Sequence, residues 1–303
     1  MTDDGQYITC SGIVSLVGAT NAGKSTLVNQ LIGEKVSIVT HKVQTTRTLV
    51  RGIFTHKGKQ IVLVDTPGIF NPGKQRDRAM VSATWNSIWN TDILLLIVDV
   101  KAGLNDAVAV ILAGLAKVHQ PKVLVLNKID RITRPGLLAL AAAVNEKVSF
   151  ERTFMISALN GSGCYDVLNY LEKILPVRPW YYPENQRSDM PIQQFAAEIT
   201  REKLYLRLHD ELPYTLTVEA IRWEECKDNS VCIEQIVYVE QKSQKKILLG
   251  HKGCTIKVIG QTARQEISKL IKRHVHLFLF VKVRHNWSKK TELYHKIGRD
   301  FSA

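Results

Sequence analysis

One glycine-rich segment close to the N-terminus limits the fold of this 303-residue chain more than any other feature. An apolar, strand-like run over residues 8–17 leads into Gly18-Ala-Thr-Asn-Ala-Gly-Lys24-Ser25, and a helix-like pattern follows over residues 26–32. This is the G-x-x-x-x-G-K-S phosphate loop, placed between a strand and a helix as its mechanism requires. Its backbone N–H groups and the helix N-terminus favour phosphate oxygens. The segment predicts an α/β domain that binds a nucleoside triphosphate through Gly18, Asn21, Ala22, Gly23, Lys24, Ser25 and Thr26.

Three oxygen-bearing side chains are placed to bind Mg²⁺ beside the phosphates. Lys24 supplies a cation for the β- and γ-phosphates, and Ser25 supplies a hydroxyl for the metal ion. In the polar segment over residues 35–49, we expect Thr46, in preference to Thr45, to offer its hydroxyl to Mg²⁺ only when the γ-phosphate is present. Asp65 ends an apolar strand and can hold the ion through water. The predicted metal ligands are Ser25, Thr46 and Asp65.

The segment Asp65-Thr-Pro-Gly68 ends a predicted hairpin over residues 48–55 and 60–64. The Gly68 N–H can approach the γ-phosphate, and we expect nucleotide contacts from all four residues: Asp65, Thr66, Pro67 and Gly68. The predicted hydrolytic residues are Lys24, Thr46, Asp65 and Gly68. Ile69 and Phe70 follow where Ras-type proteins carry a water-orienting glutamine. This difference predicts slow hydrolysis, with the water placed by another group, by K⁺ or by a bound partner.

The base is specified by two later segments, each at the end of an expected strand. Asn127-Lys-Ile-Asp130 follows residues 122–126, and Ser157-Ala158 follows residues 153–156. Asp130 can accept hydrogen bonds from guanine N1–H and N2–H, whereas adenine would leave a buried carboxylate at this position unpaired. We expect Asn127 to tie this segment to the phosphate loop, Lys128 to cover the base, and the Ser157-Ala158 backbone to meet guanine O6. The predicted ligand is GTP or GDP.

These motifs, in this order, resemble those of the translation-factor-related GTPases over residues 8–178. The resemblance implies a P-loop GTPase domain with a mostly parallel sheet and helices on both faces. It further implies one antiparallel edge strand and a single nucleotide site at the carboxyl ends of the strands.

The second half of the chain begins with a proline-rich, extended linker over residues 175–183. A helix is expected over residues 191–210, strands over 214–223 and 231–241, and a last strand over 275–283. Between the last two of these strands, residues 250–253 form a G-x-x-G turn that would bring the backbone close to a nucleic-acid strand. The predicted RNA contacts are Lys246, Gly250, His251, Lys252, Gly253, Ile256 and Lys257.

Charge is concentrated in the same region. Residues 242–303 contain 15 Lys and Arg against 3 Asp and Glu, while the whole chain has a formal net charge of +13. A block this basic favours a polyanion such as nucleic acid or an anionic membrane face. Trp287 and Tyr294 in the tail are candidates to stack on bases, and packing against the neighbouring domain is the alternative.

The order of helix, two strands, two helices and a strand resembles a type II KH domain, so the expected fold is an α/β GTPase domain followed by an α+β KH domain. Together with Gln44-Thr-Thr-Arg47, Glu198-Ile-Thr-Arg-Glu-Lys-Leu204, Glu211-Leu-Pro-Tyr214 and the segment over residues 247–253, this order resembles the Era family of bacterial GTPases. The predicted boundaries are 1–178 for the GTPase domain, 179–192 for the linker, 193–285 for the KH domain and 286–303 for a basic tail. The resemblance implies binding near the 3′ end of 16S ribosomal RNA during small-subunit (30S) assembly, and loose association with the inner membrane.

Two alternatives remain open from the sequence. The chain could be an RNA-binding protein that uses GTP as a structural cofactor, or a membrane-associated GTPase whose basic block meets anionic lipid. The N-terminus is acidic, the apolar run over residues 137–144 is too short to span a bilayer, and the five cysteines lack metal-ligand spacing. We therefore expect a monomeric cytoplasmic protein, with peripheral membrane contact as the remaining form of association.

Overall fold

The computed structural model describes residues 9–69, 75–209 and 212–285, which form two compact units. Of the described residues, the first unit contains those up to Ser37 and those within Thr46–Asp189. The second contains Ile38–Thr45 and the described residues from Met190 to residue 285. The short segment Ile38–Thr45 thus leaves the first unit, where the sequence placed it, and packs with the second.

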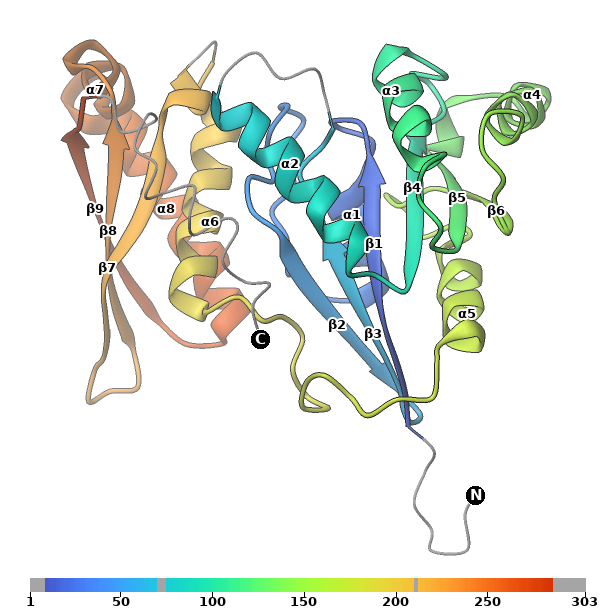
Figure 1. Cartoon of the computed structure of the whole chain (residues 1–303). Coiled ribbons are helices and arrows are strands. Elements are labelled where there is room, and N and C mark those ends of the chain that lie inside the picture. Colours follow the sequence, from blue (N-terminus) through green and yellow to red (C-terminus); the bar gives the residue numbers. More distant parts are fainter. Residues whose placement is uncertain (1–8, 70–74, 210–211, 286–303) are drawn as a thin grey trace, which may run out of the picture. The chain divides into compact units, whose positions relative to one another are not determined.

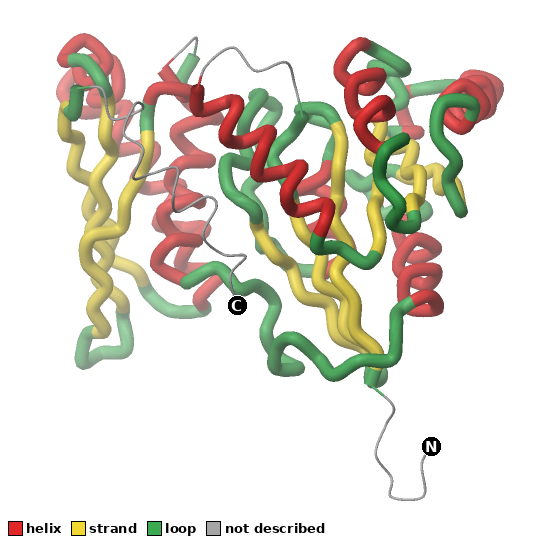
Figure 2. Tube along the Cα trace, viewed as in Figure 1, coloured by secondary structure: helices red, strands yellow, loops and turns green. Residues whose placement is uncertain are grey.

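A six-stranded sheet forms the centre of the first unit (Figures 1 and 2). Its spatial order is β2-β3-β1-β4-β5-β6, and only β2 runs antiparallel to its neighbour. The strands are β1 (Cys10–Gly18), β2 (Val50–His56), β3 (Lys59–Asp65), β4 (Ile93–Asp99), β5 (Lys122–Asn127) and β6 (Arg152–Ile156). The expected mostly parallel sheet with one antiparallel edge strand is confirmed.

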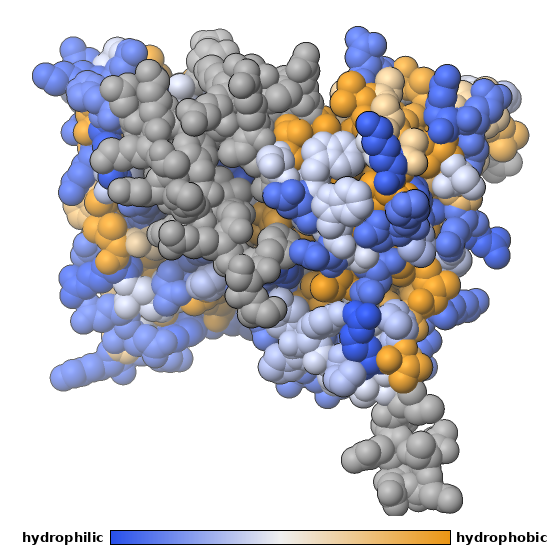
Figure 3. Space-filling view, in the orientation of Figure 1, coloured by the Kyte–Doolittle hydropathy of each residue, from blue (hydrophilic) through white to orange (hydrophobic). Residues whose placement is uncertain are grey.

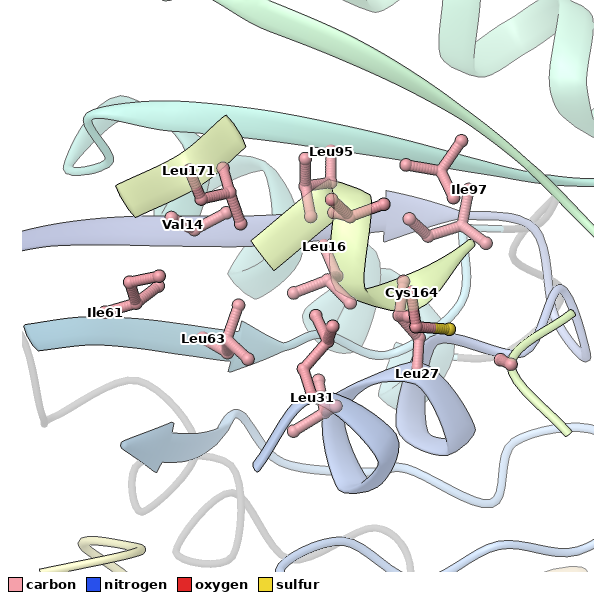
Figure 4. Close-up of a cluster of buried hydrophobic side chains, with 14 of the residues drawn as sticks. Val14, Leu16, Leu27, Leu31, Ile61, Leu63, Leu95, Ile97, Cys164 and Leu171 are labelled. Atoms are coloured by element: carbon pink, nitrogen blue, oxygen red, sulfur yellow. The ribbon is translucent and has the colours of Figure 1, made fainter. Parts of the chain in front are cut away.

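Helices cover both faces of this sheet and explain why its inner strands are largely apolar. They are α1 (Lys24–Ile32), α2 (Gln75–Trp89), α3 (Asp106–Leu115), α4 (Arg134–Asn145) and α5 (Cys164–Ile174), with a 3₁₀ turn, η1 (Ile129–Arg131). Strand β4 is buried on both sides, as expected for a parallel strand between helical layers. Figure 4 shows one face, where Leu27 and Leu31 of α1 and Leu171 of α5 pack against Leu16 and Leu63. This packing fixes the carboxyl ends of the strands, which carry the predicted site.

The second unit is a three-stranded sheet with helices packed against it. In order along the chain it contains α6 (Ile192–Arg207), η2 (Leu212–Thr215), β7 (Thr217–Glu225), β8 (Val231–Val239), α7 (Lys242–Leu249), η3 (His251–Gly253), α8 (Cys254–Ile271) and β9 (Val275–Val283). The sheet order is β7-β8-β9, with β8 and β9 parallel. The order expected from the sequence, one helix, two strands, two helices and one strand, is confirmed.

Some element boundaries differ from the expected ones for local reasons. The first helix of this unit ends at Arg207 because Leu208 adopts an extended backbone. The predicted extension to residue 210 is therefore wrong for residues 208 and 209, and residue 210 lies outside the described residues. Strand β7 starts at Thr217 because η2, which contains Pro213, occupies the preceding residues. Strand β8 ends at Val239 because Gln241 caps α7 and exchanges hydrogen bonds with Gln244 in a capping box.

Candidate functional site

The phosphate loop connects β1 to α1 and is held in a strained turn. Gly23 has φ 98°, a left-handed conformation, and a Cβ there would lie 2.2 Å from the Asn127 side-chain nitrogen. Only glycine fits such a position. Lys24 is 5% exposed, and its Nζ donates to the carbonyl oxygens of Gly18 (3.0 Å) and Ala19 (2.9 Å). Burial lowers the pKa of Lys24 to about 8, although the nearby Asp65 carboxylate opposes this effect. The lysine is therefore placed inside the loop, ready to exchange carbonyl partners for phosphate oxygens.

The three predicted metal ligands converge on one carboxylate. Asp65 Oδ2 accepts hydrogen bonds from Ser25 Oγ (2.6 Å) and, more weakly, from Thr46 Oγ1 (3.4 Å). The two hydroxyl oxygens lie 3.0 Å apart. Ser37, which is not among the predicted site residues, also donates to Asp65 Oδ2 (2.6 Å) and is aligned by Asn29. Ser25, Thr46 and Asp65 therefore form one cluster although they come from α1, a loop and β3.

The chemistry of this cluster fits Mg²⁺. Asp65 is fully buried, its Oδ1 has no hydrogen-bond partner, and burial raises the pKa of its carboxyl despite the hydrogen bonds from Ser25 and Ser37. Mg²⁺ prefers a carboxylate and other hard oxygen ligands and keeps several waters. Across the described residues, no group of three or more His, Cys, Asp or Glu side chains is placed to bind a metal. A bound Mg²⁺ would satisfy Asp65 Oδ1 and neutralise charge on the phosphate oxygens.

Asn127 ties the base-binding segment to the phosphate loop, as predicted. Its side-chain nitrogen donates to the Ala22 carbonyl (2.9 Å), and its Oδ1 accepts from the backbone of Lys128 (2.8 Å) and Ala158 (2.9 Å). Lys128 Nζ bridges the Asn21 carbonyl (2.7 Å) and Asp99 Oδ2 (2.5 Å). The Ala158 N–H is thus directed at Asn127 in this structure, and not at a free position for guanine O6.

Asp130 lies at the end of the base-binding segment and is exposed to solvent. Its Oδ1 accepts a hydrogen bond from Ser157 Oγ (2.7 Å), and this bond holds the pKa of the carboxyl below its usual value. Its side chain is 33% exposed, so the expectation of a buried carboxylate is wrong for this structure. The chain turns outward at η1, directly after β5, and leaves the carboxylate accessible from solvent. Discrimination against adenine then depends on the base itself covering Asp130.

The segment after β3 is anchored to β1, α2 and the phosphate loop. Thr66 is buried and donates to the Leu16 carbonyl (2.6 Å), while the Pro67 carbonyl accepts from Thr84 (3.2 Å). A Cβ on Gly68 would lie 2.7 Å from Thr20 Cα, so Gly68 touches the loop. Ile69 donates its N–H to the Gly18 carbonyl (3.1 Å), and its side chain is 1% exposed in the core. Ile69 cannot reach an attacking water, and Phe70 lies outside the described residues.

The G-x-x-G turn projects from the second unit between α7 and α8. Gly250 has φ 73°, and a Cβ there would lie 2.2 Å from Thr255 Oγ1, which explains the need for glycine. Most of the predicted RNA contacts are exposed, namely Lys246, His251, Lys252 and Lys257. Ile256 is half-buried against the core of this unit, and Gly253, with φ 76°, is the N-cap residue of α8. Trp287 and Tyr294 lie outside the described residues.

This geometry defines the class of protein: a GTP-binding P-loop domain joined to an RNA-binding KH module. Comparisons with known proteins agree. The family described as "50S ribosome-binding GTPase" matches residues 13–128, and the KH domain family matches residues 211–288. The curated protein "GTPase Era" of Brucella suis is 63% identical over 293 residues, covering 97% of this chain and 94% of its own. That of Rhizobium meliloti is 59% identical over 300 residues, covering 99% and 96%.

Solved structures give the same result at the level of the whole chain. A crystal structure of Era in complex with MgGDPNP and nucleotides 1506–1542 of 16S ribosomal RNA has a TM-score of 0.90, with 33% identity over 96% of this chain and 98% of that one. An Aquifex aeolicus Era variant bound to GDP and aluminium fluoride has the same TM-score and identity, covering 96% and 99%. The chain belongs to the Era family and is a GTPase.

Proposed function

We propose that this GTPase is a switch that binds the 3′ end region of 16S ribosomal RNA and assists assembly of the small (30S) ribosomal subunit. The observation that carries the proposal is the exposed G-x-x-G turn in a basic module: His251, Lys252 and Lys257 are exposed, and residues 242–303 hold 15 basic against 3 acidic residues. KH modules use such a turn to clamp a single strand. A solved relative binds nucleotides 1506–1542 of 16S ribosomal RNA, which supports this choice of RNA.

The switch is supported by the path of the loop after α1. Within the second unit, Ile38 packs against Ala196 and Ile199, and the Val39 N–H donates to Glu202 Oε1 (2.9 Å). Arg201, which is 2% exposed and ion-paired with Glu198, donates to the Thr45 carbonyl (2.7 Å). These contacts anchor residues 38–45 to α6.

The next residue, Thr46, hydrogen-bonds to Ser25 at the predicted Mg²⁺ site of the first unit. At the Thr45–Thr46 peptide bond the chain therefore passes from a residue held by Arg201 to a predicted Mg²⁺ ligand. A γ-phosphate that orders Thr46 would shift the adjoining segment over residues 38–45, which belongs to the KH unit. We propose that nucleotide state biases the RNA-binding unit through this connection.

Hydrolysis in this proposal depends on charge and position. Lys24 and the loop N–H groups would stabilise the phosphate oxygens, Gly68 would approach the γ-phosphate, and Mg²⁺ held by Ser25, Thr46 and Asp65 would supply positive charge. Because Ile69 is buried, the attacking water must be placed by another group, by K⁺ or by bound RNA or protein. The proposed enzyme therefore turns over slowly until its partner binds.

A second candidate is an RNA-binding protein for which GTP is mainly a structural cofactor, and the buried Ile69 is the observation that favours it. Single-turnover hydrolysis with and without the 3′ fragment of 16S ribosomal RNA separates the two. The switch predicts GTP cleavage that accelerates with RNA. The structural cofactor predicts equally slow cleavage under both conditions, together with RNA binding that GTP and GDP support equally.

Location follows from the proposed partner. No helix within the described ranges is long and apolar enough to cross a bilayer. We propose a monomer that works in the cytoplasm on the small subunit, with only peripheral contact at the inner membrane. Flotation with anionic vesicles, using wild type and Gly253→Asp, tests the lipid contact. If the variant keeps RNA affinity but loses vesicle binding, the basic module serves the membrane and the RNA proposal fails.

A further inference from the structure

The edge strand of the second sheet carries a row of aromatic and basic side chains that neither the nucleotide site nor the G-x-x-G turn uses. Strand β9 ends the order β7-β8-β9, and its residues alternate between two faces. Leu279 and Val281 pack inward with residues of α7 and α8. The alternate set points away from these helices and consists of His276, Phe278, Phe280 and Lys282.

The two phenylalanines are unusually accessible for their size. Phe278 is 51% exposed and Phe280 is 45% exposed. Residues two apart on one strand face project about 6.6 Å from each other, so their rings form consecutive platforms along the strand. Exposed rings grouped in this way mark an interaction site more often than a solvated surface.

Positive charge lies at the carboxyl end of the same row. Tyr238 of β8 faces Lys282 in the sheet register, and the Arg284 guanidinium lies 5.5 Å from the Tyr238 ring centroid. Within the part of the chain that the structure describes, neither Lys282 nor Arg284 forms an ion pair with a carboxylate.

The neighbouring part of this sheet face carries more acidic than basic groups, and some of them pair with one another. Glu234, opposite Phe278 in the register, is ion-paired with Arg222 of β7, which also pairs with Glu224. Positive charge on this face therefore lies at the Lys282 and Arg284 end of the row, beyond Phe280, and the acidic groups lie beside Phe278.

We propose that this outward face of β9 is a second contact site for single-stranded RNA. Bases would stack on Phe278 and Phe280, while Lys282 and Arg284 would contact the phosphates beyond them. Aromatic rings accept every base because each base has a π-face, so the site would extend affinity without reading sequence. Strand β9 packs directly on α7 and α8, the helices that flank the G-x-x-G turn, so the two surfaces belong to one rigid module. The inference rests on the proposed RNA-binding function and deepens it.

Two RNAs and three pairs of substitutions test the proposal. One RNA is a 3′-end fragment of about four to six nucleotides, which fills little more than a KH groove; the other is the same sequence extended at both ends. The protein variants are Phe278→Ala/Phe280→Ala, Phe278→Leu/Phe280→Leu and Phe278→Trp/Phe280→Trp. Ile221→Ala, at another exposed apolar position on the same sheet (50% exposed), is the matched control. Affinities are measured by fluorescence anisotropy, and circular dichroism confirms folding.

The Ala and Leu pairs should each weaken binding of the extended RNA by about tenfold or more for each ring lost. The short RNA should bind all variants equally, and the Trp pair and Ile221→Ala should match wild type. Equal binding of the extended RNA by all variants overturns the inference. So does retention of affinity by the Leu pair, because that result indicates an apolar contact without stacking.

Failure of this inference is distinguishable from failure of the proposed function. Weaker short-RNA binding by Lys252→Ala/Lys257→Ala than by wild type shows that the G-x-x-G surface binds RNA whatever the phenylalanines do. If that variant and wild type bind neither RNA, the RNA-binding function itself is wrong. If Lys252→Ala/Lys257→Ala weakens RNA binding but the Phe variants bind the extended RNA as tightly as wild type, only the β9 site is rejected.

Discussion

The nucleotide site and the RNA-binding face are built on opposite physical principles. Around the phosphates the key groups are buried and already hydrogen-bonded: Lys24 is 5% exposed, and Asp65 is fully enclosed with donors from Ser25 and Ser37. On the G-x-x-G face, Lys252 and Lys257 are exposed. A buried, preorganised group decides specificity almost alone, whereas exposed charges act additively and are screened by salt. Substitutions should therefore have large, all-or-none effects in the first unit and graded, salt-dependent effects in the second.

Asp130→Asn should produce the largest change. The amide cannot accept both guanine donors, so the ratio of GTP to XTP affinity should fall about 10⁴-fold. Competition binding against a fluorescent guanine nucleotide measures this ratio. Ser157→Ala is the graded control, because it removes only the hydrogen bond to Asp130 Oδ1 and should weaken GTP binding several-fold. An unchanged preference for GTP in Asp130→Asn would contradict the assignment of the base site.

Lys24→Ala should rank second. It removes the one cation inside the phosphate loop, and hydrolysis measured in single turnover should fall about 10²- to 10³-fold. Lys117→Ala, at an exposed position on the same unit, is the matched control and should behave as wild type. Comparable activity of the two variants would show that the loop lysine does not act on the phosphates.

Lys252→Ala/Lys257→Ala should have a smaller effect, and one that depends on salt. Each lysine lost from a phosphate contact reduces the slope of log affinity against log salt by about 1. RNA binding should weaken about tenfold at low salt and converge with wild type as salt rises. Titrations at several salt concentrations check this, with Lys117→Ala again as the control. A parallel salt slope in both proteins would place the RNA face elsewhere.

The pH dependence of GTP binding should be the smallest effect. Burial lowers the pKa of Lys24 to about 8 in the nucleotide-free protein, so the side chain loses its proton as pH rises through that value. Phosphate oxygens favour the charged form, so GTP should bind with proton uptake above pH 8, and its affinity should fall up to about tenfold per pH unit there. Calorimetry in buffers with different ionisation enthalpies measures the protons taken up. Absence of uptake between pH 8 and 9 would show that Lys24 stays charged in the free loop.

Much of the first unit could be predicted because its signals are local. The apolar run of β4 and the motifs at strand ends follow directly from chain order, since parallel strands bring their carboxyl ends to one edge. Asp99 ends β4 at that same edge and binds Lys128, so the strand pattern could also have indicated it. Ser37 gave no such signal, because its contact with Asp65 depends on Asn29 folding the loop back.

Other features arise only from tertiary packing. Residues 38–45 read as a polar loop of the GTPase domain, but Ile38 finds a place in the core of the second unit, beside Ala196 and Ile199. The accessible position of Asp130 depends on the outward turn at η1. Hydrophobic period and motif spacing do not encode these choices, which depend on the three-dimensional fit of side chains distant in sequence.

The measurement that tests the central claim most directly is the affinity for the 3′ fragment of 16S ribosomal RNA in the presence of GDPNP and of GDP. Wild type should bind the RNA several-fold more tightly in one nucleotide state than in the other. In Asp130→Asn the same difference should appear with the corresponding xanthine nucleotides and vanish with guanine nucleotides, because the base site then selects the ligand that sets the switch. Equal RNA affinity in both nucleotide states would contradict the account, since GTP binding and RNA binding would then be two independent properties of one chain.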